Sequence, residues 1–245
     1  MKKLTIGYST LASRVQNLSL PQENALFDVL VSVQLDAEYQ KPNAEIIELD
    51  STGVTKSRNA VINKAQTEYL VFADDDIEVI PNGLRQVIEY LDYHPEVSIV
   101  LARVNAGDKP RKNYPEELTT LTRFNSAKAA TPEMVIRVKA IKDAGIFFDE
   151  NFGAGMDNFL GDEYIFVSDA ISKGLKAVAL PIPIATHDEL SSGTDWQSER
   201  SVKARAKVFT RVFGKMAVFA KLGFVYKNLR NFGSLKNILR FLTTW

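Results

Sequence analysis

The alternation of short apolar segments with helical ones constrains the fold of this chain most. The apolar segments are rich in β-branched residues and bounded by polar or turn residues, which is typical of strands buried in a parallel sheet. The expected strands are residues 4–10, 28–34, 46–49, 69–73, 97–104, 132–137 and 177–186, and the expected helices are residues 53–66, 81–93, 139–144 and 162–173. This pattern predicts an α/β fold with a doubly wound, mostly parallel, Rossmann-like sheet and a loop region at residues 108–130.

The chain has no net charge, but its acids and bases are unevenly distributed. Residues 196–245 contain eleven Lys or Arg residues and a single acid, Glu199, so the rest of the chain is acidic. A basic segment of this kind suggests an anionic partner. We therefore expect a domain at residues 1–195 and a basic helical tail at residues 196–245.

Cysteine is absent, which excludes disulfides, thiolate catalysis and zinc-cysteine sites. Lys2 and Lys3 are not followed by the sustained apolar stretch of a signal peptide. The sequence contains no uninterrupted run of about 18 apolar residues, so we expect no membrane-spanning helix. These features favour a cytoplasmic protein.

Three successive carboxylates, Asp74, Asp75 and Asp76, follow the expected strand at residues 69–73. Open α/β sheets bind ligands at the carboxyl ends of their strands, and clustered carboxylates require a cation. Oxygen ligands select Mg²⁺ or Mn²⁺, whose remaining ligands are usually waters and phosphates. A solvated acidic turn is the alternative, but the buried strand before the three acids favours a metal site.

A second signal lies at the start of the expected helix at residues 53–66, where Ser57 and Arg58 stand. Free backbone N–H groups, the helix dipole and a guanidinium can together receive a diphosphate. A surface arginine in a first helical turn is the commoner case, so this signal is weak by itself.

The later part of the chain adds two further signals. Glycines in residues 152–155 allow the backbone to approach a ligand closely, and Asp162 or Glu163 at the next helix start is a candidate general base. Acids at a helix start also serve simply to complement the helix dipole. His187 ends the last expected strand, where it is either a metal ligand or a structural residue.

These signals occur in one order: Gly-x-x-x-Ser-Arg-Asn, Asp-Asp-Asp at a strand end, Phe-Gly-x-Gly with Gly-Asp-Glu, and a late histidine. In that order the sequence resembles glycosyltransferase family 2 over roughly residues 4–195. It looks most similar to the bacterial members that build capsular polysaccharide, exopolysaccharide or lipopolysaccharide chains. The resemblance implies a GT-A fold, a nucleotide-sugar donor and a divalent metal, Mn²⁺ or Mg²⁺, as cofactor.

The resemblance also implies roles for individual residues. It assigns nucleotide-sugar binding to Ser9, Thr10, Gln34, Ser57, Arg58, Asp74 and Asp75, and metal binding to His187 and to Asp74 and Asp76 of the DxD motif. Glu163 is the first choice for the catalytic base and Asp162 the second, because the second acid of this segment serves as base in the family. Many members carry an aspartate after the second strand for the uracil ring. This chain has Gln34 and then Asp36, so a UDP-sugar is the first expectation and the nucleotide stays open.

The resemblance predicts an inverting glycosyltransferase that moves a sugar to a glycan or lipid-linked acceptor in surface polysaccharide synthesis. Two alternatives stay open. A nucleotidyltransferase would share the sheet and the aspartates, but it generally needs a glycine-rich phosphate loop, which residues 9–14 do not offer. A nucleotide-sugar-binding module without activity would keep most of the same residues.

The basic tail is expected to be amphipathic. Apolar residues between Phe209 and Gly223 follow helical spacing, and most of the bases fall on the opposite side. A basic amphipathic helix with aromatic residues binds anionic membranes, so we expect a peripheral protein at the inner face of the plasma membrane. The alternative is packing on the domain or on a second subunit, so a homodimer stays open. Nucleic acid is not an expected partner.

Overall fold

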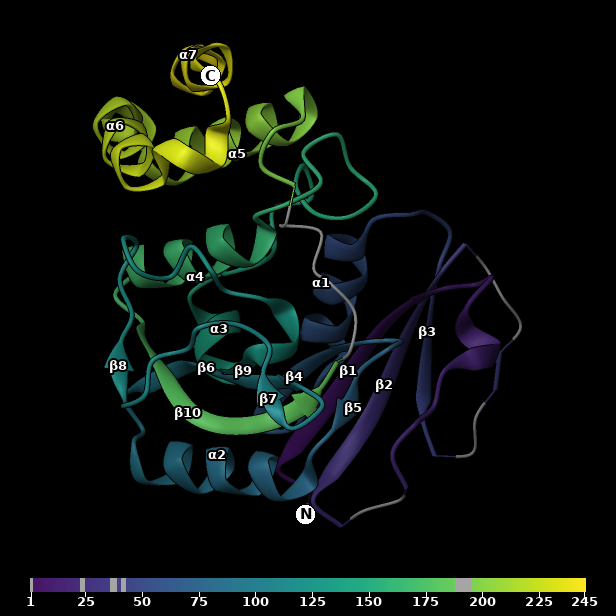
Figure 1. Ribbon diagram of the computed structural model, residues 1–245. Coiled ribbons are helices and arrows are strands. Elements are labelled where there is room, and N and C mark those ends of the chain that lie inside the picture. The colour runs from purple at the N-terminus through teal and green to yellow at the C-terminus, as the bar shows by residue number, and fades with distance from the viewer. Residues whose placement is uncertain (1, 23–24, 36–38, 41–42, 188–194) are drawn as a thin grey trace.

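The structure is a computed structural model that describes residues 2–22, 25–35, 39–40, 43–187 and 195–245. Within these residues, ten strands form one sheet at the centre of the molecule (Figure 1). The strands are β1 (Leu4–Leu11), β2 (Phe27–Gln34), β3 (Glu45–Leu49), β4 (Tyr69–Asp74), β5 (Glu78–Val79), β6 (Val97–Ala106), β7 (Lys109–Pro110), β8 (Thr119–Thr120), β9 (Met134–Arg137) and β10 (Lys176–Thr186). Every expected strand is present.

The sheet is mostly parallel, as predicted. Its order is β3-β2-β1-β4-β9-β6-β10-β5, with β7 paired to β6 and β8 paired to β10. The four strands β1 to β4 run parallel to one another, as do β6 and β10. The carboxyl ends of β1, β2 and β4 therefore meet at one edge, where an open α/β sheet binds its ligands.

Strand β9 departs from the parallel arrangement. It pairs antiparallel with both β4 and β6, although the sequence pattern predicts the strand itself. The start of β9 therefore lies at the edge of the sheet where β4 ends. Apolar periodicity identifies a strand but carries no information about its direction.

Helices cover both faces of the sheet, which confirms the doubly wound prediction (Figure 1). Helix α2 (Pro81–Tyr93) covers one face and buries Leu84, Val87 and Leu91 in the core on that side. The other face is covered by α1 (Val54–Lys64), α3 (Val138–Asp143) and α4 (Asp162–Ser172). The short 3-10 helices are η1 (Val15–Asn17), η2 (Thr131–Glu133), η4 (Gly214–Met216) and η5 (Leu229–Phe232).

Three short strands have no counterpart in the sequence prediction. Strands β5, β7 and β8 contain two residues each, and β7 and β8 lie inside the otherwise irregular residues 108–130. A strand of two residues contains no periodicity, so only its pairing partner identifies it.

The C-terminal residues form helices α5 (Glu199–Phe213), α6 (Ala217–Asn228) and α7 (Leu235–Thr243), which confirms a helical tail. In Figure 1 these helices form the layer farthest from the sheet, beyond α4. Val208 and Val212 of α5 share a buried cluster with Tyr164 and Ile165 of α4. No helix of the described residues has both the length and the apolar character that crossing a membrane requires. The division of the chain at residue 195 stays a prediction.

The prediction of a single amphipathic face between Phe209 and Gly223 is wrong. The chain turns at Gly214, whose φ is 52°, so the residues before and after it belong to different helices. Phe209 is only 7% exposed, whereas Phe219 is 67% exposed. Lys221, one of the bases, is fully buried, and its Nζ donates to Thr210 Oγ1 at 2.9 Å. Helical spacing alone does not reveal a break between two helices.

We predict that Gly7→Ala destabilises the fold. A Cβ at Gly7 of β1 would lie 2.3 Å from Cγ1 of Val61, so α1 would have to move away from the sheet. The free energy of unfolding should fall by about 1–3 kcal/mol, the usual cost of overpacking a core, in a chemical denaturation experiment. The control is Gly223→Ala, because a Cβ there meets open space. A Gly7→Ala protein as stable as wild type would contradict this close packing.

Candidate active site

The candidate site lies at the edge of the sheet where β1, β2 and β4 end. The register of the parallel strands pairs Ser9 with Asp74 and Leu11 with Gln34. The predicted residues on these strands therefore share one edge, as the strand pattern implied. Asp36, which follows β2 in the sequence, lies outside the described residues.

Arg58 of α1 is the centre of this site. Its side chain is 5% exposed, and its Nη1 donates to Asp162 Oδ2 at 2.6 Å. Its Nη2 contacts Asp74 Oδ1 at 3.3 Å, and Nη1 lies 3.9 Å from Glu163 Oε1. Burial lowers the pKa of the guanidinium, but the charges of the three carboxylates have a larger, opposite effect. The pKa of Arg58 is therefore raised above its usual value. Arg58 is therefore a buried connector between β4 and α4, not a surface arginine.

The start of α1 is held by hydrogen bonds that fix where Arg58 points. Gly53, with φ of 129°, precedes the helix, and its N–H donates to Gln34 Oε1 at 2.8 Å. The hydroxyl of Ser57 donates to the carbonyl of Ser32 at 3.4 Å. The structure thus places Gln34 and Ser57 beneath the helix start as supports. Their expected contact with the nucleotide stays a prediction.

The Gly-rich segment at residues 152–155 packs on the same helix start. The carbonyl of Ala154 accepts from Val54 N at 3.2 Å. A Cβ at Gly153, whose φ is 99°, would lie 3.1 Å from Cγ of Asp162. These glycines therefore let the segment pass close to the starts of α1 and α4. Close approach to a ligand, the expected reason for them, stays a prediction.

The three successive aspartates point to different partners. Asp74 contacts Arg58, as described above. Asp75 accepts from Thr10 Oγ1 at 2.7 Å and pairs with Arg14, whereas Asp76 Oδ2 lies 3.3 Å from His187 Nε2. Each carboxylate thus has a partner of its own, so the segment is not a solvated acidic turn.

The fit of a divalent metal follows from these partners. No cluster of three or more His, Cys, Asp or Glu side chains in the described part of the chain is arranged to hold a metal ion. Asp76 and His187 nevertheless bring a carboxylate oxygen and an imidazole nitrogen together. Mg²⁺ and Mn²⁺ sites are often completed by waters and substrate phosphates, so this pair fits an ion that binds together with a diphosphate. Asp74, the third expected ligand, instead contacts Arg58.

The two acids at the start of α4 have different surroundings. The Asp162 side chain is 5% exposed, and burial, followed by the charge of Glu163, raises its pKa against the opposing effect of Arg58. The Glu163 side chain is 20% exposed, and its Oε1 accepts from Thr131 Oγ1 at 2.7 Å. Glu163 is therefore the more accessible acid, whereas Asp162 is enclosed with Arg58.

Two residues of the site are missing from the sequence prediction, namely Thr131 and Arg14. Thr131 belongs to η2, directly before β9, and it reaches the site only because β9 runs antiparallel to β4. Arg14 follows β1 and pairs with Asp75. Neither residue stands in a motif, so no signal in the sequence identifies them.

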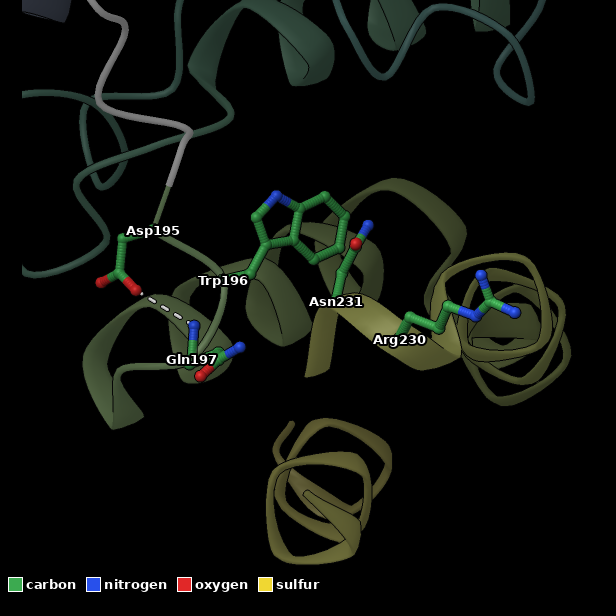
Figure 2. A pocket seen from close by; sticks show the side chains of 5 residues that line it. All are labelled: Asp195, Trp196, Gln197, Arg230 and Asn231. Carbon is green, nitrogen blue, oxygen red and sulfur yellow. Dashed lines mark hydrogen bonds between the residues drawn. The ribbon is translucent and has the colours of Figure 1, made fainter. Parts of the chain in front are cut away.

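A separate cavity of about 420 Å³ lies in the tail and is lined by Asp195, Trp196, Gln197, Arg230 and Asn231 (Figure 2). Asp195 Oδ1 accepts from the backbone N–H of Gln197 at 3.0 Å, as the dashed line in Figure 2 shows. None of the predicted site residues lines this cavity, so it is distinct from the candidate site.

Comparison with known proteins identifies related sequences and folds. Residues 31–149 match the family described as "Glycosyl transferase family 2". The poly(ribitol-phosphate) beta-N-acetylglucosaminyltransferase TarS of Staphylococcus aureus (strain Mu50 / ATCC 700699) is 27% identical over 115 residues, which are 45% of this chain and 20% of TarS. The chain thus spans about a fifth of the length of the curated relatives it matches.

Solved structures of S. aureus TarS share the fold of this chain. The structure of TarS 1-349 matches with a TM-score of 0.62 and 16% identity. The match covers 99% of this chain and 81% of the TarS chain. The structure of TarS 1-349 in complex with UDP-GlcNAc matches with a TM-score of 0.60 and 15% identity. That match covers 99% of this chain and 82% of the TarS chain. Residues 31–149 thus match glycosyltransferase family 2 in sequence, and the chain shares the GT-A fold of the TarS structures.

Proposed function

We propose that this chain is an inverting glycosyltransferase that transfers a sugar from a nucleotide diphosphate onto a hydroxyl group of a glycan or a lipid-linked acceptor. The observation that carries the proposal is the contact of one buried guanidinium with both Asp74 and the acid pair Asp162 and Glu163. The contact brings a candidate donor site at the sheet edge next to a candidate base. The match of residues 31–149 to glycosyltransferase family 2 supports the reaction class.

A UDP-sugar is the proposed donor, and surface polysaccharide is the proposed product. The relatives support both choices, because TarS is a poly(ribitol-phosphate) beta-N-acetylglucosaminyltransferase and one of its structures is a complex with UDP-GlcNAc. Ser9, Thr10 and Asp75 are proposed to contact the nucleotide, because they gather at the carboxyl end of β1 beside β4.

In the proposed reaction, Glu163 removes the proton from the acceptor hydroxyl. The oxygen of that hydroxyl meanwhile bonds to the anomeric carbon of the donor sugar. The bond from that carbon to the diphosphate breaks on the opposite side, so the configuration inverts and the electron pair leaves with the nucleotide diphosphate. Arg58 contributes positive charge at the site. A positioned base typically contributes about two to four decades in rate.

Asp76 and His187 are the residues proposed to hold the divalent metal, together with the donor phosphates. A bound Mn²⁺ or Mg²⁺ would supply positive charge to stabilise the departing diphosphate. The Asp76 side chain is 30% exposed and the His187 side chain 9%, so the histidine is the more deeply placed of the two groups. Asp74, in contact with Arg58, is proposed to lie beside the ribose.

We further propose that the outward face of α6, formed by Val218, Phe219, Leu222 and Tyr226, binds an anionic membrane. Leu222 follows Val218 by four residues and Phe219 by three, and Tyr226 follows Leu222 by four, so the four side chains share one side of the helix. Phe219 is 67% exposed and Tyr226 80% exposed. The opposite side of α6 is buried at Ala217, Lys221 and Val225. A helix that turns its large apolar side chains outward in this way requires a partner.

The charges around α6 support the proposal of an anionic membrane as that partner. Lys215, Lys227 and Arg230 lie within or next to α6, and they have no ion pair with a carboxylate of residues 2–22, 25–35, 39–40, 43–187 or 195–245. Each base near an anionic leaflet contributes on the order of 1 kcal/mol, and exposed aromatic residues enter the lipid headgroup region. The protein is thus proposed to be peripheral at the cytoplasmic face of the membrane, near a lipid-linked acceptor.

We predict that Asp76→Asn lowers turnover at least a hundredfold and removes the Mn²⁺-dependent part of UDP binding. The exchange removes a charged ligand while it keeps the shape of the side chain. Sugar transfer and the thermal shift with UDP, with and without Mn²⁺, measure these effects. The control is Asp28→Asn, an exposed carboxylate on β2 that pairs with Lys2. Near wild-type turnover in Asp76→Asn would place the metal elsewhere.

We predict that Glu163→Gln lowers kcat by about two to four decades and leaves the affinity for the donor almost unchanged. The base acts only when the acceptor loses its proton, so donor binding does not require it. Asp162→Asn should lower kcat less, because its side chain is enclosed with Arg58. Transfer kinetics with donor titration measure both effects. The opposite ranking of the two variants would assign the base to Asp162.

We predict that the full chain co-sediments with phosphatidylglycerol vesicles in a salt-sensitive way and not with phosphatidylcholine vesicles. The double exchange Phe219→Ser and Tyr226→Ser should reduce this binding at least tenfold, and so should Lys215→Glu with Lys227→Glu. The control is Tyr93→Ser, because Tyr93 is 84% exposed on α2. Unchanged vesicle binding in these variants would contradict the proposal. A wild-type dimer that the α6 exchanges dissociate would assign the face to a second copy instead.

A further inference from the structure

We propose that Thr131 is a positioning residue that orients Glu163 for proton transfer. This inference rests on the proposed role of Glu163 as the base. Thr131 Oγ1 donates to Glu163 Oε1 at 2.7 Å, and Thr131 is 1% exposed. The Thr131 hydroxyl is therefore buried against the Glu163 carboxylate. The direction of this carboxylate determines where the acceptor hydroxyl has to lie.

The contact selects one of the two carboxylate oxygens. Arg58 Nη1 lies 3.9 Å from the same oxygen, Oε1, that accepts from Thr131. A threonine hydroxyl has a single proton, and its β-branched side chain has few rotamers, so it donates in a fixed direction. With Oε1 hydrogen-bonded to Thr131 and facing the charge of Arg58, Oε2 is the oxygen that we assign to the acceptor proton.

The backbone that carries Thr131 is itself held in place. Glu133, at the end of η2, is 2% exposed, and its Oε2 accepts from Ala130 N at 3.3 Å across the turn. Glu133 Oε1 also accepts from Tyr114 Oη at 2.8 Å and lies 2.7 Å from Lys112 Nζ. Both partners belong to residues 108–130, so this segment fixes the η2 turn against the start of β9. Thr131 therefore has little freedom to follow Glu163 if Glu163 moves.

The two acids of α4 share Arg58 as a neighbour but differ in their second partner. Asp162 is held by Arg58, which also contacts Asp74, whereas the hydroxyl of Thr131 reaches only the acid proposed as base. Loss of that hydroxyl should disturb the orientation of Glu163 and leave the contact of Arg58 with Asp74 intact. The expected effect is thus on kcat and not on donor affinity. A purely structural role would change stability and donor binding together.

The test compares Thr131→Val with Thr131→Ser in the full chain. Valine has the shape of threonine without the hydroxyl, and misplacement of a catalytic group by about 1 Å costs on the order of a hundredfold in rate. We expect Thr131→Val to lower kcat about tenfold to a hundredfold with the donor KM within twofold of wild type. Thr131→Ser keeps the hydroxyl and should stay within about threefold of wild type. Equal kcat in Thr131→Val and wild type would overturn the proposal.

The matched control is Thr5→Val. Thr5 is 2% exposed and makes a hydrogen bond of 2.7 Å with Thr67, but it lies near the start of β1, away from the sheet edge that holds the site. Its exchange should leave kcat unchanged. If Thr131→Val does not fold, Thr131→Ala replaces it in the comparison with Thr131→Ser, and equal kcat in those two would overturn the proposal.

A double variant separates this proposal from the proposed function. In a Glu163→Gln background, Thr131→Val should cause no further loss of kcat, because the group that it orients is already inactive. Independent, multiplying losses would overturn the coupling. A Glu163→Gln enzyme with wild-type kcat would overturn the assignment of the base itself. A slow Glu163→Gln enzyme beside an unchanged Thr131→Val enzyme would overturn only the role of Thr131.

Discussion

The candidate site depends on the buried guanidinium of Arg58. A buried charge is stable only when it is paired, and three carboxylates from two distant parts of the chain provide the pairing. The same contacts fix the end of β4 relative to the start of α4. Helix α1 can carry this charge inward because it packs closely on Gly7 of β1 and its start is hydrogen-bonded to Gln34. Packing, hydrogen bonding and charge pairing thus act at one place.

The neighbouring aspartates show how like charges can lie close together in a folded site. Asp74 is matched with Arg58, Asp75 with Thr10 and Arg14, and Asp76 with His187. The pairing limits repulsion and gives each carboxylate a fixed direction before any ligand binds. Groups that are fixed in advance do not have to reorganise when charge develops during the reaction. The pairing is consistent with the different roles proposed for the three residues.

The tail joins the site through its inner helix. Val208 of α5 packs so closely on Gly161 that a Cβ there would lie 2.5 Å from Val208 Cγ2. Gly161 directly precedes the acid pair, so the position of α5 bears on the start of α4. Arg211 adds ion pairs to Asp149 at 2.8 Å and Asp169 at 2.7 Å. A membrane contact on α6 would therefore be mechanically connected to the site through α5.

The sequence by itself determined the strands, the helices on both faces, and the shared edge of Ser9, Gln34 and Asp74, because periodicity and strand ends are local properties. The tertiary structure decided the direction of β9, and hence the presence of Thr131 at the site. It also decided that Phe209 of α5 is buried whereas Phe219 of α6 is exposed, which a single helical period could not distinguish. Pairing direction and helix docking depend on contacts between distant residues, and these contacts leave no periodic pattern in the chain.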